Sequence, residues 1–94
     1  MIQHIHHVQI TIAAADEAAA RDFYVNVLGL RPAAKPDSLL GRGGFWVEID
    51  DQQLHVGVEE GVDRARTKAH VAYQVDDLAA WRERLAAAGV TALE

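Results

Sequence analysis

The sequence contains an internal repeat in which a predicted strand is followed by a predicted helix. This repeat restricts the possible folds of the chain more than any other feature. Residues 7–12 read HVQITI and residues 70–75 read HVAYQV, so both segments begin with His-Val and then alternate apolar with polar or small side chains. Such alternation is typical of a β-strand with one buried face. An acidic residue, a helical pattern and a glycine follow each segment. We therefore expect two related β-α units, because internal similarity of this kind indicates a repeated structural unit.

The first unit is the longer of the two. Alternating side chains predict three strands, at residues 5–12, 45–49 and 54–58. After the first strand, apolar side chains at helical spacing predict a helix over residues 16–28, with Asp16 as its N-cap and Gly29 as its stop. The segment from Arg31 reads as a short extended piece followed by loops. We therefore expect a β-α-β-β-β order in residues 5–60.

The second unit carries only the beginning of this order. Residues 69–75 read as a strand, and a helical pattern with Asp76 or Asp77 as its N-cap follows. We therefore expect residues 69–94 to be a partial copy of the first unit, truncated to β-α. A chain of 94 residues has room for one hydrophobic core. Both units are therefore expected to belong to a single domain over residues 1–94.

Composition excludes several classes of function. The net charge is −5, and no run of lysine and arginine offers the positive patch that nucleic acid or an anionic membrane would require. The chain has no cysteine, so disulfides, thiolate metal sites and a cysteine nucleophile are excluded. The sequence shows neither a secretory signal nor an apolar run long enough to span a bilayer. We therefore expect a cytoplasmic protein that contacts neither nucleic acid nor membrane.

Three histidines lie on the polar side of the predicted strands: His7, His55 and His70. Neutral imidazole is the commonest protein ligand for transition metals, and three such rings on facing strands could hold one ion. A single histidine on a strand is more often an ordinary surface residue, which is our interpretation of His4 and His6. Because strand side chains alternate between two faces, the shared parity of the three favours a common metal site.

Other polar side chains share this parity. Gln9, Gln53 and Gln74 join the histidines and give a polar lining that a hydrophobic core would not need. Trp46 and Glu48 alternate with apolar neighbours in their own strand, so they face either the same cavity or solvent. We take these five side chains as candidate substrate-binding residues. No residue clearly fills the role of a general base.

Four stretches carry a resemblance to a known superfamily: HHVQITI, FYVNVLGL, RGGFWVEIDDQQLHVGVEE and KAHVAYQVDDLAAWRERLAAAGV. They resemble the vicinal-oxygen-chelate superfamily of glyoxalases, extradiol dioxygenases, methylmalonyl-CoA epimerases, and fosfomycin and bleomycin resistance proteins. The last two stretches look most like a glyoxalase-like branch, and the resemblance covers essentially the whole chain. It implies an α+β fold in which paired βαβββ modules form a cup-shaped mixed sheet with the helices outside.

The resemblance also implies a divalent metal ion inside the cup. Ligands in that family come from the first and fourth strands of each module, which places them at His7, His55 and His70 in this sequence. The fourth ligand is usually a glutamate on the final strand and has no counterpart in the sequence. Zn²⁺, Ni²⁺, Co²⁺, Mn²⁺ and Fe²⁺ all suit such a donor set, and the sequence does not distinguish them.

A metal-dependent lyase or isomerase that acts on a small oxygenated substrate is the function that the resemblance implies. A dioxygenase is disfavoured, because the two-histidine, one-carboxylate set preferred by Fe²⁺ oxygenases is missing. Two alternatives stay open. The protein could bind a small molecule without catalysis, as antibiotic-sequestering relatives do, or it could be an inactive truncated remnant.

The truncated second unit also leads to an expectation about assembly. A sheet without its last strands would show a long unpaired edge beside an apolar surface, and such an edge invites pairing with another chain. We therefore expect a homodimer or higher oligomer, in which strands could be exchanged between protomers.

Overall fold

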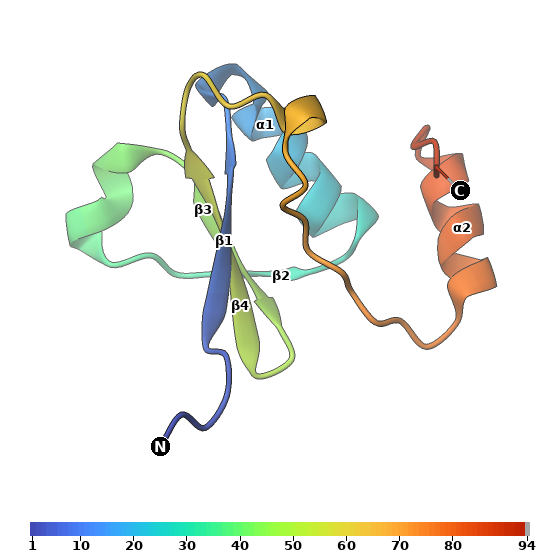
Figure 1. Cartoon of the computed structure of the whole chain (residues 1–94), viewed down its shortest axis with the longest axis horizontal. Helices are drawn as coiled ribbons and strands as arrows, with labels where there is room; N and C mark the ends of the chain where they lie inside the picture. The colour runs from blue at the N-terminus through green and yellow to red at the C-terminus, as the bar shows by residue number, and fades with distance from the viewer. Residues whose placement is uncertain (94) are drawn as a thin grey trace. The chain divides into compact units, whose positions relative to one another are not determined.

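The computed structural model of the chain describes residues 1–93. These residues separate into two compact units, Met1–Asp63 and residues 64–93. Figure 1 traces the chain through both units. The four strands belong to the first unit, and the helix α2 (Leu78–Ala87) belongs to the second.

A four-stranded mixed sheet forms the centre of the first unit. Its strands, in spatial order, are β1 (His7–Ile12), β4 (Gln52–Val58), β3 (Phe45–Ile49) and β2 (Arg31–Ala33). β1 runs parallel to β4, whereas the other two pairs are antiparallel. The predicted α+β class is therefore confirmed, and the elements of this unit follow the expected β-α-β-β-β order.

The connection from β1 to β2 is a continuous helical segment with three parts. A 3₁₀ turn (Ala14–Asp16) leads into α1 (Glu17–Arg21), and a π-helical segment, η2 (Asp22–Val27), completes it. Asp16 occupies the predicted N-cap position of α1, but its side chain makes no capping hydrogen bond, and a 3₁₀ turn precedes the α-helix.

The end of this helical segment matches the sequence prediction. Gly29 has a φ of 73°, in the left-handed region that glycine adopts without steric cost. The Leu30 N–H donates to the Tyr24 carbonyl at 3.0 Å, a bond across six residues that satisfies a carbonyl of the π-helical segment as the chain leaves it.

Alternating apolar side chains from β3 and β4 form the core of the first unit. Phe45, Val47, Leu54 and Val56 are all at most 3% exposed. Partly buried apolar side chains from β1, the helical segment and β3 pack against them, and these include Ile10, Ile12, Ala20, Tyr24 and Val25. The helical segment therefore covers one face of the sheet and leaves the polar side chains on the other face.

The backbone has a positive φ on either side of β3, at Gly44 and at Asp50. β3 and β4 join through a hairpin in which Ile49 pairs with Gln52, and Asp50 adopts a φ of 52° in the turn between them. Gly44 precedes β3 with a φ of 82°, and a Cβ atom there would lie 2.2 Å from the carbonyl oxygen of Val56. Only glycine fits this close approach.

The second unit contains α2 (Leu78–Ala87) and a segment without strands before it. Asp77 is confirmed as the N-cap, since its Oδ1 accepts a hydrogen bond from the backbone N–H of Ala80 at 3.1 Å. The predicted strand at residues 69–75 does not form in the structure. No strand among the described residues of this unit offers it backbone partners, and a lone strand cannot satisfy its own N–H and C=O groups.

None of the helices formed by residues 1–93 combines the length and the apolar character needed to cross a bilayer.

Candidate functional site

One face of the sheet, here called the polar face, gathers six of the eight side chains singled out in the sequence. Strand alternation and register place them together: His7, Gln9, Trp46, Glu48, Gln53 and His55. His55 lies at the centre, because it pairs with Gln9 of β1 on one side and with Trp46 of β3 on the other. The glycine at position 57 leaves room for Gln9, since a Cβ atom there would lie 2.9 Å from the Gln9 Nε2.

Three rings of the polar face form a stack across three strands. The ring centroids of Trp46 and His55 are 3.7 Å apart with an angle of 1° between the planes, and those of His55 and His7 are 4.1 Å apart with an angle of 15°. His6 extends this group, with its ring edge-on to His7 and the two Nδ1 atoms 2.9 Å apart. One of these two rings must donate to the other at that distance.

His55 is held neutral inside this stack. Only 5% of the residue is exposed, and its Nε2–H donates to the Gln53 Oε1 at 2.8 Å. Burial, which penalises the charged ring, and the electrostatic effect of the neighbouring His7, His6 and Lys35 together lower the pKa of His55 to about 4. A neutral imidazole with one nitrogen already donating keeps a lone pair on the other, here Nδ1.

The backbone positions of His7 and His55 fit a shared metal ion, but their ring planes do not. An imidazole binds a metal along a lone pair that lies in the ring plane, at about 2.0–2.1 Å for zinc. Two nearly parallel rings with centroids 4.1 Å apart aim these lone pairs along separate planes. Within residues 1–63, no third histidine, aspartate or glutamate joins the pair in a metal-binding group. As the rings stand, the residues therefore form no metal site.

His70 and Gln74 lie in the second unit, in the segment before α2. Both are exposed, and the His70 Nδ1–H donates to the backbone carbonyl of Lys68 at 2.8 Å. The expectation that these two side chains join the polar face stays a prediction.

His4 and His6 were both predicted to be ordinary surface residues, and the structure confirms this for His4 but adds a ring contact for His6. His4 is exposed and donates from Nδ1 to the adjacent Ile5 carbonyl at 3.1 Å, as expected of a surface residue. His6 is also exposed, but its ring contacts His7. β1 begins only at His7, so the strand expected from residue 5 is shorter in the structure and its alternation does not extend to His6.

The candidate substrate residue Glu48 has a partner on β2. Its Oε2 lies 3.6 Å from the Arg31 Nη1, and both side chains line an open cavity of about 420 Å³ together with Gly29, Leu30 and Asp50. The ion pair is solvent-exposed, so it orients Glu48 more than it stabilises the fold.

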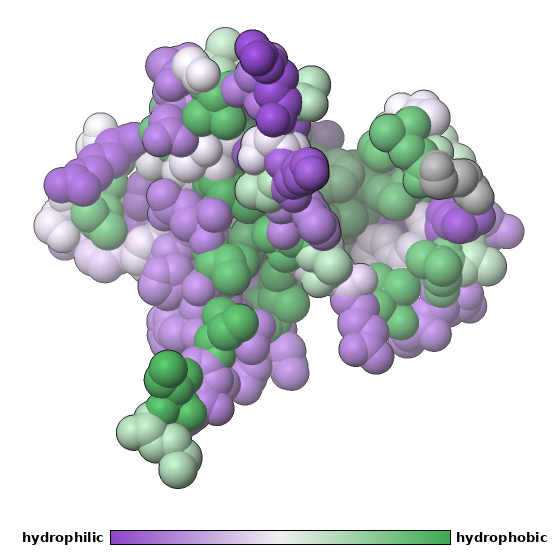
Figure 2. Space-filling model, in the orientation of Figure 1, coloured by the Kyte–Doolittle hydropathy of each residue, from purple (hydrophilic) through white to green (hydrophobic). Residues whose placement is uncertain are grey.

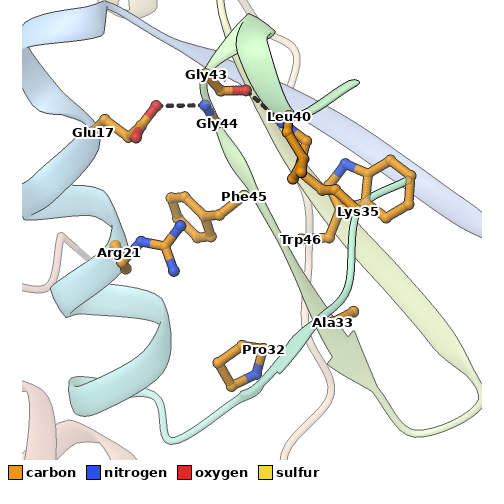
Figure 3. A pocket seen from close by; sticks show the side chains of 10 residues that line it. All are labelled: Glu17, Arg21, Pro32, Ala33, Lys35, Leu40, Gly43, Gly44, Phe45 and Trp46. Carbon is orange, nitrogen blue, oxygen red and sulfur yellow. Dashed lines mark hydrogen bonds between the residues drawn. The ribbon is translucent and has the colours of Figure 1, made fainter. Parts of the chain in front are cut away.

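A second cavity of about 340 Å³ lies between α1, β2, β3 and the loop over residues 34–44, which includes a 3₁₀ helix, η3 (Asp37–Arg42) (Figure 3). We call it the side pocket; Glu17, Arg21, Pro32, Ala33, Lys35, Leu40, Gly43, Gly44, Phe45 and Trp46 line it. Trp46 is the only one of these that sequence reasoning singled out. The others come from α1, β2, β3 and the segment between β2 and β3, so no single periodic pattern in the sequence could have gathered them.

Comparison with known families gives one match over nearly the whole chain. Residues 4–94 match the family model of the Glyoxalase/Bleomycin resistance protein/Dioxygenase superfamily. No curated protein matches the sequence.

Solved structures with the same fold include three with informative descriptions. A glyoxalase family protein from Bacillus anthracis is 35% identical, with a TM-score of 0.85 over 95% of this chain and 72% of that one. Lactoylglutathione lyase from Agrobacterium tumefaciens is 21% identical, with a TM-score of 0.61 over 94% of this chain and 71% of that one. A mutant of the fosfomycin resistance protein FosX from Listeria monocytogenes is 18% identical, with a TM-score of 0.69 over 97% of this chain and 73% of that one. The FosX structure contains Mn(II) and 1S,2S-dihydroxypropylphosphonic acid.

Proposed function

Because this chain belongs to the glyoxalase/bleomycin resistance protein/dioxygenase superfamily, we propose that its polar face binds a small oxygenated molecule and that the protein acts on it as a lyase or isomerase. The observation that carries the proposal is the stack of Trp46, His55 and His7, which lies among the other polar side chains of this face. A purely structural sheet face would not need a buried, neutral histidine at its centre.

Each group of the polar face has a distinct part in this proposal. The side-chain amides of Gln9 and Gln53 carry both donors and acceptors, so they suit hydroxyl and carbonyl oxygens of a substrate. The stack fixes the ring of His55, while His7 is exposed and can reach a bound molecule. Because one Nδ1 of the His6–His7 pair donates to the other, the Nε2 of His7 is the nitrogen left to exchange a proton with substrate.

We also propose that His7 and His55 contribute ligands to a divalent metal ion, as the Mn(II) in the FosX structure suggests. The donor chemistry supports a transition metal ion, since imidazole nitrogen suits Zn²⁺, Ni²⁺ and Fe²⁺. Binding would require the exposed ring of His7 to turn out of the stack, because the observed ring planes do not converge. No chemical step of the proposal depends on the ion.

A metal titration tests this part of the proposal. Protein without a polyhistidine tag, stripped with chelator, is titrated by calorimetry with Mn²⁺, Ni²⁺ and Zn²⁺ in turn. We expect one ion per chain, and an affinity that falls at least tenfold in His55→Ala and in His7→Ala, in line with the loss of one metal ligand. His4→Ala is the matched control, because His4 is exposed and lies outside the polar face. Substoichiometric binding, or an equal loss in His4→Ala, would contradict the proposal.

A ligand titration tests the substrate part independently of any metal. The two compounds named with the relatives, lactoylglutathione and 1S,2S-dihydroxypropylphosphonic acid, serve as probes, and the side-chain amide signals of Gln9 and Gln53 are followed by NMR. Movement of these signals at millimolar probe or below supports the polar face as the binding surface. Movement confined to other residues contradicts it.

A noncatalytic binding protein is the second candidate function. It is favoured by one observation: within residues 1–63, no group of three histidine, aspartate or glutamate side chains is placed to hold the metal ion that a lyase or isomerase of this type would use. Product analysis after long incubation with lactoylglutathione separates the two functions, since binding without turnover supports this second candidate.

A further inference from the structure

We propose that the side pocket is a second binding site of this protein, for a small aromatic carboxylate that Arg21 and Lys35 hold by its charge. The pocket belongs to the first unit and opens beside the sheet rather than on the polar face, so the proposal goes beyond the function proposed above. Its volume of about 340 Å³ is at the lower end of the range for small-ligand pockets.

Two hydrogen bonds hold the pocket open in the absence of a ligand. The Gly44 N–H donates to the Oε1 of Glu17 and ties the loop to α1, and the Lys35 Nζ donates to the Gly43 carbonyl at 2.7 Å. Figure 3 shows both bonds at the rim of the pocket. The wall is therefore formed before a ligand arrives, which lowers the entropic cost of binding.

Arg21 presents its donors to the pocket without a carboxylate partner. Its guanidinium carbon lies 4.9 Å from the centre of the Phe45 ring, and among the described residues no carboxylate lies within ion-pair distance of it. Stacking occupies the flat face of a guanidinium and leaves the N–H groups along its edge available. Figure 3 shows the Arg21 side chain over Phe45, which is itself 3% exposed and fixed in the core. The edge of Arg21 therefore offers the planar pair of donors that a carboxylate accepts.

Lys35 supplies a second positive charge on the other side of the pocket. Its ammonium group donates one hydrogen bond to the Gly43 carbonyl, and its two other N–H donors are available for a ligand. The positive charge of Lys35 is also felt at His55, where it helps to lower the pKa of the ring. Glu17 adds one negative charge to the lining, but its Oε1 is engaged by the Gly44 N–H. The lining therefore carries a net positive charge.

Apolar side chains around these charges favour an aromatic body on the ligand. Pro32, Leu40 and Trp46 line the pocket, and Leu40 is 60% exposed. One face of the Trp46 indole is covered by His55 at 3.7 Å, and Trp46 also belongs to the lining of the side pocket. Trp46 therefore lies between the two sites and can report on both.

The test uses the full chain labelled with ¹⁵N and benzoate as the probe. We expect saturable movement of the Trp46 indole N–H signal and of the Gly43 and Gly44 amide signals at millimolar benzoate. Benzyl alcohol, a neutral probe of similar size, should bind at least fivefold more weakly, because it lacks the charge that Arg21 and Lys35 recognise. Equal binding of the two probes would overturn the proposal, as would the absence of movement in all three signals.

Charge substitutions locate the site. Arg21→Gln and Lys35→Gln should each weaken benzoate binding about fivefold, as expected for the loss of one partly exposed charge-assisted contact. Arg42→Gln is the matched control, because Arg42 belongs to the same loop but does not line the pocket. Arg21→Lys and Lys35→Arg keep the charge and should retain more affinity than the glutamine variants. An unchanged affinity in both glutamine variants, or an equal loss in Arg42→Gln, would overturn the assignment.

The signals also separate this proposal from the proposed function. Benzoate should leave the side-chain amide signals of Gln9 and Gln53 in place, since these residues are on the polar face and do not line the side pocket. Benzoate that moves the Gln9 and Gln53 signals, and not those of Gly43 and Gly44, binds the polar face and overturns the side-pocket proposal alone. A failed metal titration with intact benzoate binding overturns only the metal part of the proposed function.

Discussion

At the scale of single residues, His55 has the environment that departs furthest from its ordinary one. It is enclosed by Trp46 on one side and His7 on the other, and its Nε2–H is committed to Gln53. Sequence parity was sufficient to place His55 and His7 on one face, because alternation depends only on the backbone. It could not supply the ring stacking, which depends on side-chain torsions and on the exact twist between strands.

The lowered pKa of His55 predicts a pH-dependent stability. In the unfolded chain the ring titrates near its ordinary pKa of 6.5, whereas in the fold it titrates at about 4. Between these values the unfolded state binds the additional proton, so the free energy of unfolding decreases as the pH falls from 6.5 to 4. We expect this ring to account for a loss of about 2–4 kcal/mol, since one pKa unit corresponds to about 1.4 kcal/mol.

Urea unfolding of metal-free protein at several pH values measures this dependence. Protonation of carboxylates contributes over the same range, so the comparison is with His55→Gln, which lacks the titrating ring and should show a flatter dependence. His4→Gln, at an exposed site, should behave as the wild type. Identical slopes for the wild type and His55→Gln would show that the ring titrates normally in the fold.

The backbone conformation of Gly44 predicts that a larger side chain at this position destabilises the fold. Gly44→Ala should lower the free energy of unfolding by about 2 kcal/mol or more, because the added Cβ would meet the Val56 carbonyl and the backbone has a positive φ. Gly41→Ala is the control in the same loop, since nothing lies within 4 Å of its Cβ position. Thermal or urea unfolding of the two variants side by side checks the difference, and equal stabilities would refute the steric argument.

At the scale of elements, sequence patterns were most informative where the partners of a strand are also in the chain. The strand predicted at residues 45–49 has those bounds in the structure, and it pairs with β4 in an antiparallel hairpin. Residues 69–75 have the same alternation and form no strand. Alternation reports which side chains could be buried together, but a strand also needs a neighbour for its backbone.

The helix after β1 shows a different limit of sequence patterns. The spacing of apolar side chains predicted the helix but not its π-helical part, in which the Leu28 N–H donates to the Phe23 carbonyl at 2.8 Å. A π turn takes an additional residue, so consecutive side chains such as Tyr24 and Val25 both reach the core. A template with 3.6 residues per turn cannot anticipate this shift.

The N-cap of α2 predicts how strongly this helix depends on one side-chain hydrogen bond. Asp77→Ala should destabilise α2 by about 1 kcal/mol, because the Ala80 N–H loses its side-chain acceptor. Amide hydrogen exchange within Leu78–Ala87 measures the effect directly, and faster exchange is expected there. Asp76→Ala removes the same charge from the neighbouring position without removing the cap. Equal exchange rates in the two variants would mean that charge, rather than capping, stabilises the helix.

At the scale of the whole molecule, the first unit leaves β1 paired on one side only. β4 is its single neighbour among the strands of residues 1–63. Apolar residues before β1 are strongly exposed, with Ile2 at 94% and Ile5 at 60%, and Figure 2 shows apolar side chains projecting at this N-terminal end. Unpaired edges and exposed apolar groups both favour association with another chain. We therefore propose that β1 and the residues before it contact a second copy of this chain.

Sedimentation at several concentrations tests this assembly. The wild type should sediment as a dimer at micromolar concentrations, and Ile2→Lys combined with Ile5→Lys should raise the dissociation constant at least tenfold, since burying one isoleucine contributes about 1.5–3 kcal/mol. Leu93→Lys is the matched control, because Leu93 is also 94% exposed but lies far along the sequence from β1. A wild type that stays monomeric at tens of micromolar would remove the proposal.

The parallel pairing of β1 with β4 also bears on how the first unit folds. β1 is synthesised before its partner β4 (Gln52–Val58), so its backbone must wait for this pairing until most of the first unit has been synthesised. The β3–β4 hairpin is local and can form without it. Contacts between segments distant in sequence close slowly, and exposed strands are vulnerable to aggregation while they wait. We therefore expect the N-terminal strand to dock late, as the step that completes the sheet.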